Sequence, residues 1–252
     1  MKINSDINVL GSLPDLNLIS IFMNESIKSL NQNSGHYSYT TIKTDKSVKR
    51  FEKAITNTML RFSNKKIEVL FRSILSVEII SADSLLMIFW NTSFNNQLLN
   101  YLNEKVYFPA LYSGRVAIKQ PEVSACLTEL KETEPELKKW ADSTIEVTAS
   151  KYLTLLKKFN LMSGSLNKSI NNNYLNDKMF ILFVYWILAV ETKSNILEST
   201  WLDYCFLERK IFIERIMNKK FSKYINIYFT GDNLKIEPII EFENIYYEIT
   251  KS

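Results

Sequence analysis

Glycine and proline are scarce in this chain, and their scarcity limits the folds that it can adopt. Only five of each occur among 252 residues. β-Sandwiches and barrels need many tight turns built from these residues, so the composition favours helices. The same scarcity removes the glycine-rich loops that cradle phosphates, because neither GxGxxG nor GxxxxGK[ST] occurs. The sequence therefore predicts a mainly α-helical protein.

The rest of the composition indicates a folded protein without a metal or a cofactor. Hydrophobic residues make up 46% of the chain and charged residues 23%, and the length allows one large domain or two small ones. One histidine, His36, and two separated cysteines, Cys126 and Cys205, cannot form a zinc site of usual spacing. His36 could in principle act as a lone base, but a surface histidine is the simpler interpretation. We expect both cysteines to be buried reduced thiols, which fits a cytoplasmic protein.

The most apolar run, Met179–Val190, lies between Lys178 and Glu191 and is twelve residues long. A helix needs about 20 apolar residues to span a membrane, so we expect a buried core helix here. The first residues, Met1–Asn8, lack the apolar core of a secretory signal. The sequence thus predicts a cytoplasmic protein with no integral membrane span.

Residues 121–162 predict three consecutive helices with tight connections. Pro121 and Pro135 suit the first turns of the first two helices, and Ser143 is expected to cap the third, with Glu146 completing a capping box. The third helix has an apolar face and a polar-to-basic outer face, which consists of Thr144, Thr148, Lys151, Thr154 and Lys158. This order is typical of a helix-turn-helix unit. A three-helix piece of an ordinary α-helical core would give the same pattern.

The predicted helix at residues 45–62 carries a concentrated positive charge. Four basic residues, Lys46, Lys49, Arg50 and Lys53, share one face of it. Residues 41–72 contain nine basic and three acidic residues, a local net charge of +6, whereas the whole chain has +4. Lys65 and Lys66 extend this set into the next predicted helix, residues 64–80. Most charge runs are solvated helix faces, but this density favours an anion-binding surface, and nucleic acid is the commonest large anion.

Three further helices are predicted in the first half of the chain. They cover residues 15–30, 82–90 and 95–105, with Asn91 ending the second and Ser93 capping the third. Residues 106–120 are an aromatic-rich connector. A linker rich in Ser and Asn at residues 163–173 divides an N-terminal helical domain, 1–165, from a C-terminal subdomain, 174–252.

The C-terminal subdomain predicts the element order of a winged helix. An apolar helix at residues 177–192 and a short helix at 199–205 precede a basic helix at 206–220. A β-hairpin follows over residues 223–238, because the apolar period changes to two around Gly231-Asp-Asn. Residues 239–249 could add a strand or a helix. Arg209, Arg215 and Lys219 of the basic helix are candidate DNA contacts.

The chain resembles the BrxA proteins of bacteriophage exclusion (BREX) systems. The resemblance rests on the basic amphipathic segment 47–55, the run Leu70-Phe-Arg-Ser-Ile-Leu, the connector from Asn100 to Gly114 and the stretch from Trp140 to Met162. It is best over residues 45–165. The chain departs from the family in having Asn160-Leu where a Gly-Leu exit is more typical, and its C-terminal third matches only in element order.

The resemblance implies a mostly helical, non-enzymatic cytoplasmic protein with helix-turn-helix-like units, which binds double-stranded DNA and works with other proteins of an anti-phage system. The basic faces would then contact phosphates, and the third helix of residues 121–162 would enter a groove. The candidate DNA-binding residues are Lys46, Lys49, Arg50, Lys53, Lys65, Lys66, Thr144, Thr148, Lys151, Lys158, Arg209, Arg215 and Lys219.

Two other functions remain open at this point. The chain could be a protein–protein interaction scaffold whose basic face docks an acidic partner. A nuclease is the weaker alternative, because the sequence shows no convincing catalytic carboxylate cluster.

Overall fold

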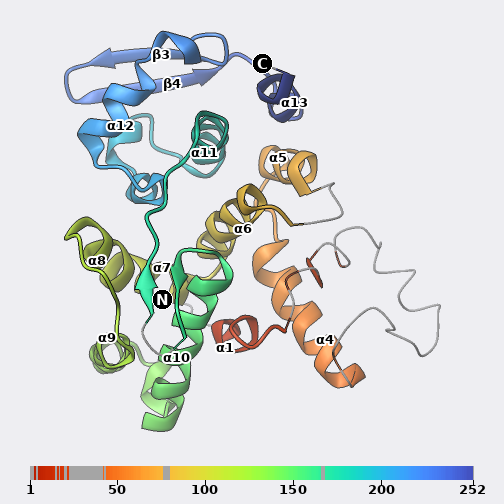
Figure 1. Cartoon of the computed structure of the whole chain (residues 1–252), viewed down its shortest axis with the longest axis vertical. Helices are drawn as coiled ribbons and strands as arrows, with labels where there is room; N and C mark the ends of the chain where they lie inside the picture. Colours follow the sequence, from red (N-terminus) through yellow and green to blue (C-terminus); the bar gives the residue numbers. More distant parts are fainter. Residues whose placement is uncertain are drawn as a thin grey trace. The chain divides into compact units, whose positions relative to one another are not determined.

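A computed structural model of the chain describes residues 3, 5–14, 16, 18, 19, 22, 42, 44–75, 80–165 and 168–251. These residues form mainly helices, with two small antiparallel hairpins, so the predicted mainly α-helical fold is confirmed (Figure 1). Most of the predicted helix 15–30, and His36, lie outside the described residues. The chain forms two compact units, which are Met1–Arg61 with Val77–Asn172, and Phe62–Ser76 with Asn173–Ser252. A segment from within the first 165 residues thus belongs to the second unit.

The described part of the first unit consists of short and medium helices and one small hairpin. Its α-helices are α1 (Asp6–Leu10), α4 (Asp45–Ala54), α6 (Ala82–Asn95), α7 (Gln97–Leu102), α8 (Phe108–Tyr112), α9 (Gln120–Thr133) and α10 (Asp142–Lys158). Two short π-helical segments, η1 (Ile55–Met59) and η2 (Asn103–Tyr107), and one 3₁₀ turn, η3 (Leu137–Lys139), link some of them. Strands β1 (Met162–Ser163) and β2 (Ser169–Ile170) pair after α10.

The predicted three-helix stretch, residues 121–162, is present in altered form. Pro121 lies in the first turn of α9, as predicted. The middle helix is only the single 3₁₀ turn η3, and α10 starts at Asp142 without a side-chain cap. The predicted capping box is therefore wrong, because the carboxylate of Glu146 instead accepts a hydrogen bond from Gln120 Nε2, 2.8 Å away.

Helix α10 is covered on its polar side by α1 (Figure 1). The amide of Asn8 donates to the hydroxyl of Thr148 at 3.1 Å, and Thr148 is fully buried. The chain passes so close at Gly11 that a Cβ atom there would lie 2.5 Å from the carbonyl oxygen of Lys151. The packing of a distant segment therefore decides which face of α10 reaches solvent.

Two asparagines on α6 bind the end of the helical segment formed by α4 and η1. Asn91 is buried, and its Nδ2 donates to the carbonyls of Met59 at 2.8 Å and Arg61 at 3.1 Å. Asn95 Nδ2 reaches the carbonyl of Thr58 at 2.9 Å. The predicted break at residues 91–95 is wrong, since α6 runs through them and these amides bind carbonyls that would otherwise lack partners.

Helix α7 begins at Gln97, so that only Asn96 separates it from α6. Asn96 caps it by accepting the Leu99 N–H at 2.9 Å, so the predicted Ser93 cap is wrong. The predicted connector at residues 106–120 contains the end of η2 and helix α8.

The second unit combines helices with the predicted hairpin. Its α-helices are α5 (Lys65–Leu75), α11 (Asp177–Val190), α12 (Arg209–Ile216) and α13 (Ile245–Lys251), and its 3₁₀ turns are Ile196–Glu198, Thr200–Cys205 and Lys219–Phe221. Strands β3 (Ile225–Thr230) and β4 (Asn233–Pro238) pair from Ile225↔Pro238 to Thr230↔Asn233, which confirms the hairpin. Residues 239–249, left open from the sequence, end in a helix.

The predicted basic helix at 206–220 is shorter than expected. Phe206 adopts a left-handed conformation with φ of 57°, which delays the start of α12 to Arg209. Asn218 then caps a separate 3₁₀ turn. Cys205 is buried as predicted, whereas Cys126 is only partly buried, and both thiols are free.

Helix α11 is the core of the second unit. Every side chain from Met179 to Ile187 is buried, which confirms the predicted core helix. The hydroxyl of Tyr185 lies 2.9 Å from the carbonyl oxygens of Tyr224 and Ile240, and its burial raises the pKa of Tyr185 to about 12. Across the described ranges of the chain, no helix is both long and apolar enough to cross a membrane.

We expect Gly11→Ala to destabilise the first unit, because the added methyl group would collide with the Lys151 carbonyl. The free energy of unfolding should fall by about 1–3 kcal/mol, the usual cost of overpacking. Urea denaturation would measure the change. Ser143→Ala, an exposed change on α10, is the control and should leave stability within about 0.5 kcal/mol of the unchanged protein. Equal stability of Gly11→Ala and the control would contradict the close packing.

Asn91→Ala should also lower stability, by about 1–3 kcal/mol, because it leaves the buried carbonyl of Met59 without this donor, whereas the Arg61 carbonyl keeps the Asn95 amide at 2.8 Å. Amide hydrogen exchange should show faster opening of α4 and η1. Asn57→Ala removes an exposed amide from the same region and serves as the control. A variant at Asn91 as stable as this control would show that the contact has no structural role.

Candidate nucleic-acid interface

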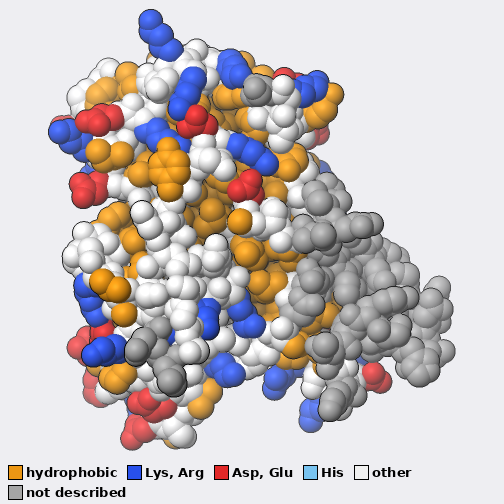
Figure 2. All heavy atoms as spheres, in the orientation of Figure 1, with side chains coloured by type: hydrophobic (Ala, Val, Ile, Leu, Met, Phe, Trp, Pro, Cys, Tyr) orange, Lys and Arg blue, Asp and Glu red, His pale blue; other side chains and the backbone are white. Residues whose placement is uncertain are grey.

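Helix α4 presents the basic residues that the sequence singled out. Thr44 caps its start by accepting the Ser47 N–H at 3.3 Å. Val48, Phe51 and Ala54 are buried. The cations lie away from this buried side and are all exposed: Lys46, Lys49, Arg50 and Lys53. On the face drawn in Figure 2, Lys and Arg side chains occur along the part of the molecule where α1, α4 and α10 lie.

The cations of α4 are available to an outside anion. In the part of the chain that the structure describes, none of the four forms an ion pair. The guanidinium carbon of Arg50 lies 5.4 Å from the centre of the Phe51 ring. Burial raises the pKa of the Asp6 carboxyl on α1, and the positive charge of Lys53 opposes this rise only in part. The helix therefore offers four solvated cations on one surface.

The predicted groove-facing residues of α10 are largely occupied within the first unit. Thr148 is fully buried, and its hydroxyl donates to the carbonyl of Thr144 at 2.7 Å. The ammonium of Lys158 donates to the carbonyl of Leu13. Lys151 is partly buried beside Gly11, and Thr144 is partly buried. Thr148 is therefore unavailable as a DNA contact in this structure, because α1 covers it.

A lysine cluster that the sequence did not reveal lies beside α10. The β1–β2 hairpin brings Lys168 near Lys157 and Lys151, and burial together with these two positive charges lowers the pKa of the Lys168 ammonium. This hairpin lies mostly within residues 163–173, which were predicted to be a linker. Only the positive φ of 88° at Gly164, between the two strands, corresponds to a sequence signal that could have indicated a turn.

The basic residues of α5 belong to the second unit and already have partners there. Lys65 and Arg72 pair with Glu68 at 3.3 Å and 2.9 Å. Hydrogen bonds from Arg72 and then Lys65 hold the pKa of Glu68 below its ordinary value. The ammonium of Lys66 lies 5.3 Å from the centre of the Phe242 ring. Lys65 and Lys66 are both exposed.

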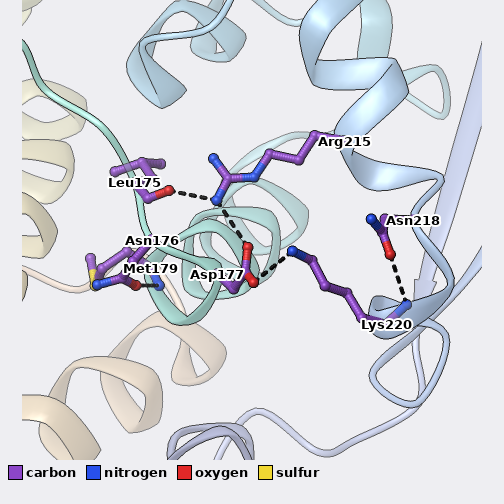
Figure 3. Close-up of polar contacts among 7 residues, drawn as sticks. All are labelled: Leu175, Asn176, Asp177, Met179, Arg215, Asn218 and Lys220. Atoms are coloured by element: carbon purple, nitrogen blue, oxygen red, sulfur yellow. Dashed lines mark hydrogen bonds and ion pairs between the residues drawn. The ribbon is translucent and has the colours of Figure 1, made fainter.

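Arg215 has an internal role that its position in the sequence does not reveal. Its side chain is only 12% exposed and donates to the Leu175 carbonyl at 2.5 Å and to Asp177 Oδ1 at 3.2 Å. Figure 3 shows Arg215 and Lys220 approaching the Asp177 carboxylate, with Lys220 Nζ 2.6 Å from Oδ2. Arg215 is therefore primarily a bridge between α12 and the start of α11. Arg209 and Lys219, in contrast, are exposed.

The described side chains include no group of three or more His, Cys, Asp or Glu residues that is arranged to hold a metal ion.

A family model described as BrxA matches residues 22–183. This range exceeds half of the chain and contains α4, α10 and the first part of α11. No curated protein and no solved structure matches the chain.

We expect Asp177→Asn to reduce the dependence of stability on acid pH. Hydrogen bonds from Lys220 and Arg215 lower the folded-state pKa of Asp177, so its stabilising effect is present above the unfolded-state pKa of about 3.9. That effect is lost as pH falls through the lower folded-state pKa. At pH 7 the substitution should cost about 0.2–1 kcal/mol, since the carboxylate is half exposed.

Urea unfolding at pH 7 and at intervals below pH 5 would measure the difference between the two proteins. The gap in stability should narrow as pH falls. Glu243→Gln, an exposed carboxylate of the same unit, is the control and should track the unchanged protein. A gap that stays constant down to pH 2 would contradict the role assigned to the Asp177 charge.

Proposed function

Because this chain belongs to the BrxA family, whose members are components of BREX phage-defence systems, we propose that it is a non-enzymatic accessory factor that binds duplex DNA in the cytoplasm. The single observation that carries the proposal is the set of four exposed cations on α4, none of which forms an ion pair with a described residue. Other proteins of the defence system are the expected partners.

The spacing of these cations suits a phosphate backbone. Lys46 and Lys53 are seven residues apart, which corresponds to roughly 10 Å along a helix that rises 1.5 Å per residue. Duplex DNA carries one charge for about every 1.7 Å of its axis, so several phosphates lie within reach of such a stripe. Contacts of this kind position a protein on DNA but carry no sequence information. We therefore expect binding with little sequence preference.

The lysine cluster beside α10 supports the same function. Burial, and then the positive charges of Lys157 and Lys151, lower the pKa of the Lys168 ammonium. Such repulsion between like charges is relieved when a phosphate is bound, so part of the cost of holding the lysines together is recovered in a complex. Because Thr148 is buried, α10 would contribute Lys151 and Lys157 to such a contact rather than Thr148.

A protein–protein scaffold is the second candidate, and exposed apolar side chains favour it. Val116 is 77% exposed and Val147 is 50% exposed, and Tyr112 is also exposed. Apolar side chains at the surface are common contact points in interfaces, although single ones are ordinary. In this alternative the α4 stripe would bind an acidic protein, and duplex DNA would compete poorly for it.

Replacing Lys46, Lys49, Arg50 and Lys53 together by Ser should weaken duplex binding across unrelated DNA sequences. Each neutralised phosphate contributes about −0.9 to the slope of log affinity against log salt, so the slope should flatten by up to about 3.6. The fold should survive, because these side chains lie away from Val48, Phe51 and Ala54. Fluorescence anisotropy of labelled duplexes at several salt concentrations would measure both effects.

A matched control removes the same charge elsewhere in the first unit. Lys119, Lys131, Lys138 and Lys139 can be changed together to Ser, since they lie on or beside α9 and η3. This control should keep most of the slope. If both variants lose the same amount of duplex affinity, the effect comes from net charge and not from the α4 surface. If the unchanged protein does not bind duplex DNA even at low salt, the DNA-binding proposal is wrong and the scaffold function is favoured. Binding unaffected by the α4 change would move the contact to Arg209, Lys219 and the hairpin that follows them.

A further inference from the structure

Three lysines line a small cavity in the second unit, and none of the three is among the candidate DNA contacts named above. Lys178, Lys220 and Lys223 line a cavity of about 180 Å³, together with Phe221, Tyr224, Ile249 and Asp177. Lys178 comes from the first turn of α11, whereas Lys220 and Lys223 come from the segment that precedes β3. The fold therefore brings together cations that are more than 40 residues apart in the sequence.

Aromatic rings hold each lysine in place. The ammonium groups of Lys178, Lys220 and Lys223 lie 4.8, 5.0 and 4.8 Å from the ring centres of Tyr246, Phe221 and Tyr224. A cation over a ring face is attracted to it, which limits the conformations of a flexible lysine stem. The three charges are thus partly preorganised, and less entropy is lost when an anion binds.

Asp177 is the one carboxylate among the described residues that line the cavity, and it does not neutralise the three lysines. Asp177 is held by Arg215 and Lys220, as Figure 3 shows, and their hydrogen bonds keep its pKa below the ordinary value. The described lining of the cavity thus holds three lysines and one carboxylate. Asp177 and Lys178 also open α11, whose positive dipole end adds to the field at the cavity. The local balance therefore favours a second, external anion.

We propose that this cavity binds a phosphate group. Its volume is below the roughly 300–1,000 Å³ of sites for drug-sized ligands, which suits a compact tetrahedral oxyanion instead. Lysine ammonium groups donate charge-assisted hydrogen bonds to phosphate oxygens. The phosphate could be part of a DNA backbone or of a free phosphate-bearing compound. The site goes beyond the proposed DNA surface, because it lies in the second unit and uses none of the α4 residues.

Titration of the full chain with inorganic phosphate, at an ionic strength held constant with chloride, tests the site. Calorimetry should detect binding, and the double variant Lys178→Gln/Lys223→Gln should bind at least about tenfold more weakly, because it loses two charge-assisted hydrogen-bond donors. Lys193→Gln/Lys210→Gln removes the same charge from exposed positions of this unit and should bind normally. Circular dichroism checks that each variant folds, and Lys223→Arg, which keeps the charge, should retain binding if the double variant unfolds.

Absence of phosphate binding by the unchanged protein, or equal binding by the double variant, would overturn the site. Duplex binding by the same variants identifies the source of the phosphate. A parallel loss of duplex affinity assigns it to DNA, and unchanged duplex affinity assigns it to a free compound, so both results support the site. The α4 quadruple variant should bind inorganic phosphate normally, which separates failure of the DNA proposal from failure of this one.

Discussion

The buried amide of Asn91 is the contact on which the placement of the basic helix depends. α4 and η1 form one continuous helical segment, and its last carbonyls point away from water, where unpaired acceptors are costly. Asn91 and Asn95 supply donors from α6, so the segment ends at a fixed position relative to the rest of the first unit. Burial of Val48 and Phe51 then fixes its rotation. The outward direction of the four cations follows from these two constraints.

Local signals in the sequence predicted a large part of the fold. The apolar run of α11, the stripe of α4 and the turn chemistry of the β3–β4 hairpin are each decided by residues close in sequence, and all three elements are present. The outer face of α10 could not be predicted in this way. Asn8 and Thr148 are 140 residues apart, and nothing near either residue indicates that α1 covers α10. A polar helix face can serve solvent, DNA or another helix, and only the tertiary fold decides among these.

The candidate site shows the same limit for charged residues. In the sequence, Arg209 and Arg215 are equivalent cations on one predicted helix, but Arg215 binds Asp177 and the Leu175 carbonyl, whereas Arg209 is exposed. Lys168 joins the α10 lysines only because β1 and β2 pair. A count of charge along the chain therefore identified α4, where one helix carries the whole set, and missed clusters assembled from separate elements.

Free and paired cations also differ in what they contribute to binding. When an exposed lysine such as those on α4 neutralises a phosphate, a cation condensed on the DNA is released to the solvent. Lys65 must give up Glu68 before it can bind a phosphate, so the gain from one ion pair is offset by the loss of another. The slope of affinity against salt therefore depends on the number of unpaired cations at the contact and not on the number of all basic residues near it. In the proposed contact with DNA, the α4 stripe would therefore contribute more to the electrostatic part of the affinity than α5, which carries a comparable number of basic residues.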